Sequence, residues 1–364
     1  MSVIALAALA IWAYLILAHG RFWSSRPQLM PAVAASCPDV DIVVPARDEE
    51  ETIAAVIASL LKQDYPGKFR VLLVDDNSTD TTAERAGRAP NLSVIRGDPK
   101  PQGWAGKMWA LRQGVQAGKA PLILFTDADI VHDPEHLSAL VARLPGLDLV
   151  SEMVRLNCAS LAERALVPAF VYFFQMLYPF ARVNDPRSRV AAAAGGTVLI
   201  ARAVLERIGG IDAVKDALID DVALAKKVKA AGGALYLGHS GLASSIRPYP
   251  HFADVWRMIA RTAFTQLRYS AVLLFLTVIG LSLVWLAPVV LMLVGQPWER
   301  LCGLAAFGAA AASYLPTLRR YGRSALWAPM LPLIAAFYMA ATVGSALSHW
   351  RGAGARWKNR SYLG

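Results

Sequence analysis

Residues 271–294 form an apolar stretch without a single charged side chain. At about 1.5 Å of rise per residue, a helix over this stretch can cross a hydrocarbon core of about 30 Å. Apolar stretches also occupy residues 301–316 and 325–347, and another opens the chain at residues 3–18. Hydrophobic residues make up 55% of the chain and charged residues 18%, and the apolar excess lies in these flanking stretches. We therefore expect a membrane protein with a polar domain between its apolar ends.

The apolar ends define the expected membrane topology. Residues 1–20 are predicted to be an uncleaved transmembrane anchor, because no charged side chain precedes the apolar run and bulky, basic residues follow it. Such an anchor leaves the amino terminus outside and the next domain in the cytoplasm. Residues 271–348 would form two to three transmembrane helices, and residues 349–364 a basic C-terminal tail. If all three stretches span, this tail ends outside, so either the preference of basic residues for the inside fails or one stretch is re-entrant.

The net charge of +10, from 37 basic and 27 acidic residues, favours a membrane over nucleic acid as the partner. Many basic residues flank apolar segments, where they attract anionic lipid head groups. These residues are Arg21, Arg26, Arg268, Arg319, Arg320, Arg323, Arg351, Arg356, Lys358 and Arg360. The cysteines Cys37, Cys158 and Cys302 form no CxxC pair, which argues against a disulfide framework or a zinc cluster.

The polar part of the chain, residues 39–245, alternates short apolar runs with amphipathic segments. The predicted elements include strands at residues 40–44, 70–74, 92–95 and 121–125 and a helix at residues 50–63. This alternation is typical of a Rossmann-like α/β fold, in which a mostly parallel sheet is covered on both faces. Ligands of such sheets bind beyond the carboxyl ends of the strands.

Polar clusters follow three of the predicted strands at the point where each strand ends. The clusters are Arg47-Asp48-Glu49, Asp75-Asp76-Asn77 and Asp127-Ala128-Asp129. We expect them to share one edge of the sheet and to form a site there. Because Asp127 and Asp129 are one residue apart, their carboxylates can hold a hard divalent cation through oxygen ligands. That cation would neutralise the diphosphate of a nucleotide sugar and stabilise it as a leaving group.

Local structure offers a second explanation for some of the acidic residues. In the segment 75–80, Ser78 or Asp80 could cap the next helix. Asp220 and Asp221 precede another predicted helix, and acidic residues are favourable at a helix N-terminus. A carboxylate there could also be the base that deprotonates an attacking hydroxyl.

Two further motifs do not match established sites. Lys107 follows a glycine but does not belong to a phosphate loop, because Pro101 and Met108 stand at two of the required positions; Lys107 can still meet a phosphate. His132 and His136 are four residues apart, but a proline lies between them and no third zinc ligand is evident.

Two segments are candidates for contact with the membrane surface. Residues 168–180 are uncharged and aromatic-rich, are bracketed by Pro168 and Pro179, and are too short to span. They form either a buried helix or an interfacial one. Residues 246–270 are predicted to be an interfacial amphipathic segment, because apolar and cationic positions within 251–268 have helical spacing.

In order and spacing, the motifs of the polar domain resemble those of family 2 glycosyltransferases, which have the GT-A fold. The matching pieces are VVPARDEE (43–50), VDDNSTD (74–80), GWAGKMWAL (103–111), TDAD (126–129), AGGTVLIARAVLERIGG (194–210) and IDDVALAKKVKAAG (219–232). Residues 153–186 and 247–270 are similar to the hopanoid-biosynthesis-associated branch of that family. The resemblance then covers nearly the whole chain.

The resemblance implies a donor site at the sheet edge. Pro45, Arg47, Asp48, Asp75 and Asp76 would bind the nucleotide-sugar donor, in part near its nucleobase and ribose.

It also implies a site for the diphosphate and its cation. Asp127 and Asp129 would hold Mg²⁺ or Mn²⁺ together with the diphosphate, Asp129 as the stronger metal ligand. Lys107 and Arg268 would be further donor-binding residues.

Catalytic and acceptor residues follow from the same resemblance. Asp221 matches the catalytic base of the family, and the preceding Asp220 is shorter than the usual glutamate, so either member of the pair could act. Phe170, Phe173 and Tyr178 would lie in the acceptor region.

The implied reaction is an inverting, metal-dependent, single transfer of a sugar, with a UDP-sugar favoured, to a hopanoid or related lipid hydroxyl. Thr265 and Tyr269 depart from the QxxRW motif of the family, which argues against processive synthesis. The protein would be a multi-pass protein of the bacterial inner membrane. The alternatives are an enzyme of the same fold that acts on a carotenoid, a glycerolipid or a polyprenyl phosphate, and a catalytically silent scaffold that binds nucleotide sugar.

Overall fold

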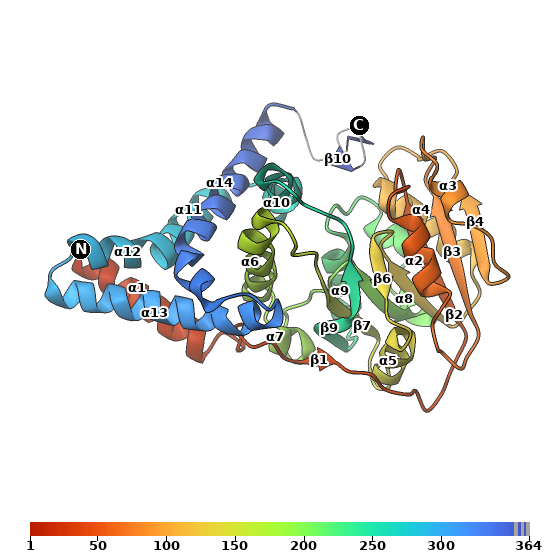
Figure 1. The fold of residues 1–364 in the computed structure, drawn as a ribbon, viewed down its shortest axis with the longest axis horizontal. Helices are drawn as coiled ribbons and strands as arrows, with labels where there is room; N and C mark the ends of the chain where they lie inside the picture. Colours follow the sequence, from red (N-terminus) through yellow and green to blue (C-terminus); the bar gives the residue numbers. More distant parts are fainter. Residues whose placement is uncertain (353–355, 358–359, 362–364) are drawn as a thin grey trace. The chain divides into compact units, whose positions relative to one another are not determined.

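The computed structural model describes residues 1–352, 356–357 and 360–361, and the chain divides into two compact units (Figure 1). The α/β unit contains residues 26–157 and 182–247. The helical unit contains residues 1–25 and 158–181 and, among the described residues, 248–352. The predicted basic tail, 349–364, lies partly outside the described residues.

The α/β unit is built on one mixed sheet, which has nine strands within the described residues. They are β1 (Gln28–Leu29), β2 (Val40–Ala46), β3 (Phe69–Asp75), β4 (Leu92–Arg96), β5 (Leu122–Thr126), β6 (Ile130–His132), β7 (Leu149–Arg155), β8 (Thr197–Ala201) and β9 (Leu235–Ser245). The order is β1-β9-β7-β8-β5-β2-β3-β4, with β6 on β9. Strand β8 runs antiparallel to β5 and β7, and β6 to β9, while the other pairs are parallel. The predicted α/β fold with a mostly parallel sheet is confirmed.

Helices connect the strands of this unit: α4 lies beside the neighbouring strands β2 and β3, and α2 lies beside β6 (Figure 1). The helices are α2 (Ile53–Leu60), α3 (Thr82–Arg85), α4 (Gly106–Ala117), α5 (His136–Arg143), α8 (Arg202–Arg207), the 3₁₀ helix η1 (Ile211–Val214) and α9 (Asp220–Ala230); α7 (Phe180–Asn184) lies where the chain returns from the helical unit. The central strands β2 and β5 are fully buried, and most of their residues are apolar on both faces.

The buried carboxylate of Asp41 bonds to groups on several of these elements. Asp41 on β2 is 2% exposed. Its Oδ1 pairs with Arg70 on β3 over 3.0 Å, and its Oδ2 pairs with Arg202 on α8 over 3.0 Å. Its Oδ2 also accepts from the backbone N–H of Ala120 over 2.7 Å, just before β5. A buried charge is tolerated when it is paired and hydrogen-bonded in this way.

The Asp41→Asn substitution is expected to lower the free energy of unfolding by about 2 kcal/mol, because charge-assisted hydrogen bonds to both arginines are lost. The midpoint of thermal unfolding of the full-length protein in detergent measures this. Arg187→Gln is the control, since Arg187 pairs with Asp185 on the surface and its side chain is 92% exposed. Equal midpoints for the two variants would contradict the structural role of Asp41.

The helical unit packs around a core of large side chains from distant segments. It comprises α1 (Ser2–Leu17), α6 (Leu161–Leu177), α10 (Phe252–Gln266), α11 (Ala271–Leu281), the π-helix η2 (Ser282–Leu286), α12 (Ala287–Val294), α13 (Pro297–Arg320), the 3₁₀ helix η3 (Ala325–Met330) and α14 (Leu331–Trp350). Trp12, Tyr172, Trp285 and Tyr314 are each at most 1% exposed and belong to one core cluster.

In the described part of the chain, three helical stretches are long and apolar enough to cross a membrane. They are Ala271–Val294, Pro297–Arg320 and Ala325–Trp350. They contain the three apolar stretches predicted from the sequence, and the second and third extend beyond the predicted ends. Helix α1 is shorter, at 16 residues, or about 24 Å. Its role as a membrane anchor stays a prediction.

Helix α6 differs from the segment predicted at residues 168–180. It begins at Leu161, because Ser160 and Glu163 form a capping box, and it continues through Pro168 to Leu177. The prediction that Pro168 begins this segment is therefore wrong. Phe173 packs edge-to-face against Trp285, which agrees with the buried alternative for α6.

Candidate active site

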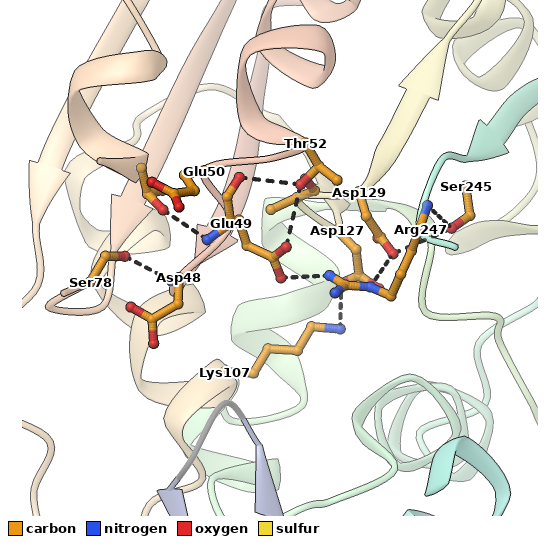
Figure 2. Close-up of polar contacts among 12 residues, drawn as sticks. Asp48, Glu49, Glu50, Thr52, Ser78, Lys107, Asp127, Asp129, Ser245 and Arg247 are labelled. Atoms are coloured by element: carbon orange, nitrogen blue, oxygen red, sulfur yellow. Dashed lines mark hydrogen bonds and ion pairs between the residues drawn. The ribbon is translucent and has the colours of Figure 1, made fainter. Parts of the chain in front are cut away.

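The loops after β2 and β3 are bound to each other at the carboxyl ends of these strands. Arg47 Nη1 donates to the backbone carbonyl of Asp76 over 2.5 Å. Asp48 Oδ1 accepts from the backbone N–H of Thr79 over 2.8 Å. The Asp48 N–H donates to Ser78 Oγ over 3.0 Å (Figure 2). The structure therefore brings together four predicted donor-binding residues, Arg47, Asp48, Asp75 and Asp76.

The sequence offered a second explanation for the acidic residues after β3, the capping of the next helix, and this explanation applies to Asp80. Its Oδ1 accepts from the backbone N–H of Thr82 over 3.0 Å, and its Oδ2 accepts from the N–H of Glu50 over 3.1 Å. These hydrogen bonds act to lower the pKa of Asp80, although burial opposes them. Asp80 thus organises the start of α3, as a turn residue would.

Lys107 joins two of the acidic groups. It lies in the first turn of α4, where the helix dipole disfavours a cation. Its Nζ is 2.7 Å from Asp127 Oδ1 and 3.0 Å from Asp220 Oδ2. Burial acts to lower the pKa of Lys107, but the carboxylates of Asp127 and Asp220 together raise it above its ordinary value. Lys107 is therefore a fixed positive charge between the end of β5 and the start of α9.

Asp221 is a carboxylate in an unusual environment. Burial and repulsion from Asp220 raise its pKa to about 7, against the opposing effect of Lys107. Asp220 and Asp221 are in the first turn of α9 and do not precede it. Gly195 allows its own loop to approach α9 closely, because a Cβ added at Gly195 would be 3.2 Å from Asp221 Oδ2.

A pocket collects several of the predicted site residues. It is lined by Pro45, Lys107, Met108, Leu111, Phe125, Thr126, Asp127, Gly195, Val198, Ile211, Val214, Asp220, Asp221 and Leu224. Its apolar walls come from β2, β5, β8, α4, η1 and α9, and its charged groups from Lys107 and the three aspartates. A pocket of this kind can hold an anionic group at Lys107 and present a carboxylate with a raised pKa beside it.

Asp129 lies next to this pocket and has a partner that the sequence did not suggest. Arg247 Nε is 2.8 Å from Asp129 Oδ2, and Arg247 Nη2 is 2.6 Å from Glu49 Oε1 (Figure 2). Ser245 Oγ also donates to Asp129 Oδ2 over 3.3 Å. Each carboxylate of the Asp127–Asp129 motif thus has its own basic partner.

The oxygen ligands at this edge fit a shared cation better than a resident one. Among the described residues, no group of three or more His, Cys, Asp or Glu side chains could hold a metal ion by itself. Mg²⁺ is commonly bound by one or two carboxylates together with substrate phosphates. Asp127 and Asp129 supply such a pair, so they fit a divalent cation that arrives with a diphosphate.

His132 and His136 belong to a buried hydrogen-bonded chain and not to a metal site. His132 Nε2 is 3.0 Å from Thr126 Oγ1, the two Nδ1 atoms of the histidines are 2.8 Å apart, and His136 Nε2 is 2.5 Å from Glu152 Oε1. Burial and the neighbouring His136 lower the pKa of His132 well below its ordinary value. This chain supports β5 directly before Asp127.

Four predicted site residues are in the helical unit. Arg268 follows α10 in a left-handed backbone conformation with φ of 51°. Phe170 and Phe173 are on α6, and Tyr178, which follows it, accepts from Gln266 Nε2 over 2.5 Å. Their roles in donor and acceptor binding stay predictions.

The chain is similar to known proteins in sequence and in fold. Residues 41–209 match glycosyl transferase family 2. An uncharacterized glycosyltransferase of Mycobacterium tuberculosis is 39% identical over 113 residues, which are 31% of this chain and 47% of that relative. The chain thus spans about half the length of this relative.

Two other relatives have more specific names. An N-acetylglucosaminyltransferase of Bradyrhizobium elkanii is 30% identical over 35% of this chain and 70% of its own length. A beta-monoglucosyldiacylglycerol synthase of Nostoc is 37% identical over 27% of this chain and 21% of its own length.

Among solved structures, a mannosyltransferase from Pyrobaculum calidifontis in complex with GDP-Man and Mn²⁺ shares the fold. It has a TM-score of 0.59 and 21% sequence identity, and the match covers 95% of this chain and 98% of that one. Fold, motif matches and relatives agree: the chain belongs to glycosyltransferase family 2.

Proposed function

We propose that the protein transfers one sugar from a nucleotide-diphosphate donor to the hydroxyl of a membrane lipid, with inversion at the anomeric carbon. The observation that carries the proposal is the pocket in which Lys107, Asp127 and Asp221 converge. It combines a fixed cation for an anionic donor with a carboxylate whose pKa of about 7 suits a general base at neutral pH.

Separate groups of residues would bind the donor and activate the acceptor. Arg47, Asp48, Asp75 and Asp76 would hold the nucleoside at the ends of β2 and β3. Lys107 would pair with the donor diphosphate, since an ammonium group binds phosphate as a point charge.

Asp127 and Asp129 would hold Mg²⁺ or Mn²⁺ next to that diphosphate. The cation would neutralise the charge that develops on the leaving diphosphate. Asp221 would accept the proton of the acceptor hydroxyl as its oxygen attacks the anomeric carbon from the opposite face. Asp220 would hold Lys107 in place, as its 3.0 Å contact suggests.

A lipid acceptor is supported by the apolar helices. Three helical stretches are long and apolar enough to cross a membrane, which supports a position of the helical unit in or at a bilayer. The Nostoc relative is named for a lipid product. A hopanoid is the specific acceptor we propose, on the resemblance of residues 153–186 and 247–270 to that branch. Phe170, Phe173, Tyr178 and the segment 246–270 would guide this lipid, and Arg268 would assist with the donor diphosphate.

The cellular location follows from the same proposal. The α/β unit would face the cytoplasm, where nucleotide sugars are made, and the protein would be a multi-pass protein of the bacterial inner membrane.

The test is turnover of the purified full-length protein in detergent with UDP- and GDP-sugars, Mn²⁺ and bacterial lipid extract, read by mass spectrometry. GDP-mannose belongs in the panel because the Pyrobaculum structure contains it. A glycosylated hopanoid that forms only with metal would support the whole proposal. A glycosylated carotenoid or glycerolipid would replace the acceptor. Donor binding without transfer to any lipid would favour a silent nucleotide-sugar-binding scaffold.

The pH dependence of the reaction tests Asp221 separately. A base must be ionised to accept a proton, and the pKa of Asp221 is raised to about 7. We therefore expect kcat/KM to fall below about pH 7, by about tenfold for each further pH unit, and to level off above it. A profile that stays flat down to pH 5 would contradict the assignment of Asp221 as the base.

A further inference from the structure

Arg247 lies beside the Asp127–Asp129 motif because of how the sheet is built. It follows β9, which pairs antiparallel with β6, so that Ile130 lies opposite Ser245. The backbone N–H of Ile246 donates to the carbonyl of Asp129 over 2.9 Å. The backbones that carry Arg247 and Asp129 are therefore fixed next to each other, although 118 residues separate them.

The guanidinium of Arg247 forms ion pairs with two carboxylates. Its Nε pairs with Asp129 over 2.8 Å and its Nη2 with Glu49 over 2.6 Å. Arg247 is 30% exposed, whereas the side chains of Asp129 and Glu49 are 14% and 9% exposed. A nearly buried carboxylate requires a partner, and the guanidinium at the rim supplies one that a ligand can reach.

Glu49 is itself held in place. Its backbone N–H donates to Thr82 Oγ1 over 2.7 Å. The Thr52 hydroxyl, which donates to the carbonyl of Ala128 inside the Asp127–Asp129 motif over 2.8 Å, lies 3.3 Å from Glu49 Oε2. Glu49 can therefore retain Arg247 when the contact to Asp129 is broken. Release of Asp129 requires the loss of one ion pair and not two.

We propose that Arg247 is the resident counter-ion of Asp129. When the donor diphosphate and its cation bind, the guanidinium of Arg247 is displaced from Asp129 and pairs with that diphosphate. This inference rests on the proposed function, because it concerns the same donor. A divalent cation alone at Asp129 would leave the guanidinium beside a second positive charge, which is repulsive. A diphosphate removes this repulsion, since the planar guanidinium matches phosphate oxygens.

The proposal makes cation and diphosphate binding cooperative. Cation alone competes with Arg247 for Asp129 and binds weakly. Cation with diphosphate binds well, because the displaced guanidinium gains a new partner. A coupling of this kind typically changes an affinity by about 5–150-fold.

The experiment compares the full-length protein and Arg247→Gln in detergent, by electron paramagnetic resonance of Mn²⁺ and by calorimetry with UDP or GDP. Without nucleotide, the variant is expected to bind Mn²⁺ about tenfold more tightly; with Mn²⁺ present, it should bind the nucleoside diphosphate about tenfold more weakly. The two shifts have opposite signs. A misfolded variant would lose both affinities, so misfolding cannot imitate the result.

Two further variants serve as controls. Arg207→Gln removes an ion pair of 2.7 Å to Asp148 elsewhere on the α/β unit, from a side chain that is 51% exposed, and should leave both affinities unchanged. Arg247→Lys keeps the charge but cannot bridge two carboxylates as a planar fork does. Its affinities should lie between those of the wild type and Arg247→Gln.

The outcomes separate this inference from the proposed function. If Arg247→Gln binds Mn²⁺ alone with unchanged or lower affinity, the role of Arg247 is overturned and the transferase proposal stands. If the opposite shifts occur but no lipid gains a sugar, the role of Arg247 stands and the proposed reaction fails. If the wild type binds no Mn²⁺ even with nucleotide, both are overturned.

Discussion

Replacement of Asp221 by asparagine is expected to slow sugar transfer by about 10²–10⁴-fold, the usual contribution of a general base. Asparagine cannot accept the proton of the acceptor hydroxyl, yet it fills nearly the same space next to Gly195. Donor affinity should therefore change by less than about threefold, so that the loss lies in kcat. Turnover by mass spectrometry and donor binding by calorimetry, both with Mn²⁺, measure the two effects.

The neighbouring carboxylates provide controls for this result. Asp216→Asn alters an exposed aspartate before the same helix and should leave turnover unchanged. Asp220→Asn removes a partner of Lys107 and should weaken donor binding. Full activity in Asp221→Asn together with a loss of kcat in Asp220→Asn would assign the base to Asp220.

The second large effect is expected for Lys107→Met, which removes the charge but keeps a similar length. Truncation of one partner of a buried charge pair costs about 2–5 kcal/mol, so the affinity for the donor should fall by about 30-fold or more. Asp127, Asp220 and Asp221 would then lack the cation between them. Because Lys107 lowers the pKa of Asp221, its loss should also move the acid limb of the pH profile of kcat/KM to higher pH.

Donor titration and the pH profile together test this role. Lys119→Met is the matched control, since Lys119 is exposed just beyond the other end of α4. Weaker donor binding with an unmoved acid limb would mean that Lys107 binds the diphosphate without acting on Asp221. An unchanged donor affinity would remove Lys107 from the donor site.

The sequence identified the first half of the sheet better than the second. Strands β2 to β5 are short apolar runs, and a run of this kind is a reliable signal. Strand β7 has Ser151 and Glu152 at its centre, which obscure its apolar pattern. Both are buried there because distant groups satisfy them: Ser151 Oγ accepts from Ala194 N–H over 2.9 Å, and Glu152 pairs with His136. Such partners are not visible in a local pattern.

The same contrast applies to the candidate site. The polar clusters after strands predicted Asp127 and Asp129 at one edge of the sheet. Asp220 was expected at the start of a helix and Lys107 near a phosphate, and the contacts of Lys107 with Asp127 and Asp220 come from the structure alone. Arg247 opens the segment 247–270, but no sequence pattern connected it with Asp129, and the pairing of β6 with β9 brings the two residues together.

A sequence signal for α6 existed. Ser160 and Glu163 have the spacing of a capping box, whereas Pro168 suggested a boundary because proline usually interrupts a helix.

Helix α6 also affects the order in which the protein can fold during its synthesis. It ends at Leu177, and its core partner Tyr314 is on α13, which starts at Pro297. At about 5–20 residues per second, the roughly 120 residues between these helices take about 6–24 s to translate. During that time Tyr172 can meet Phe22 but not Tyr314. The face of α6 that packs against Tyr314 therefore lacks this native partner until α13 has been synthesised.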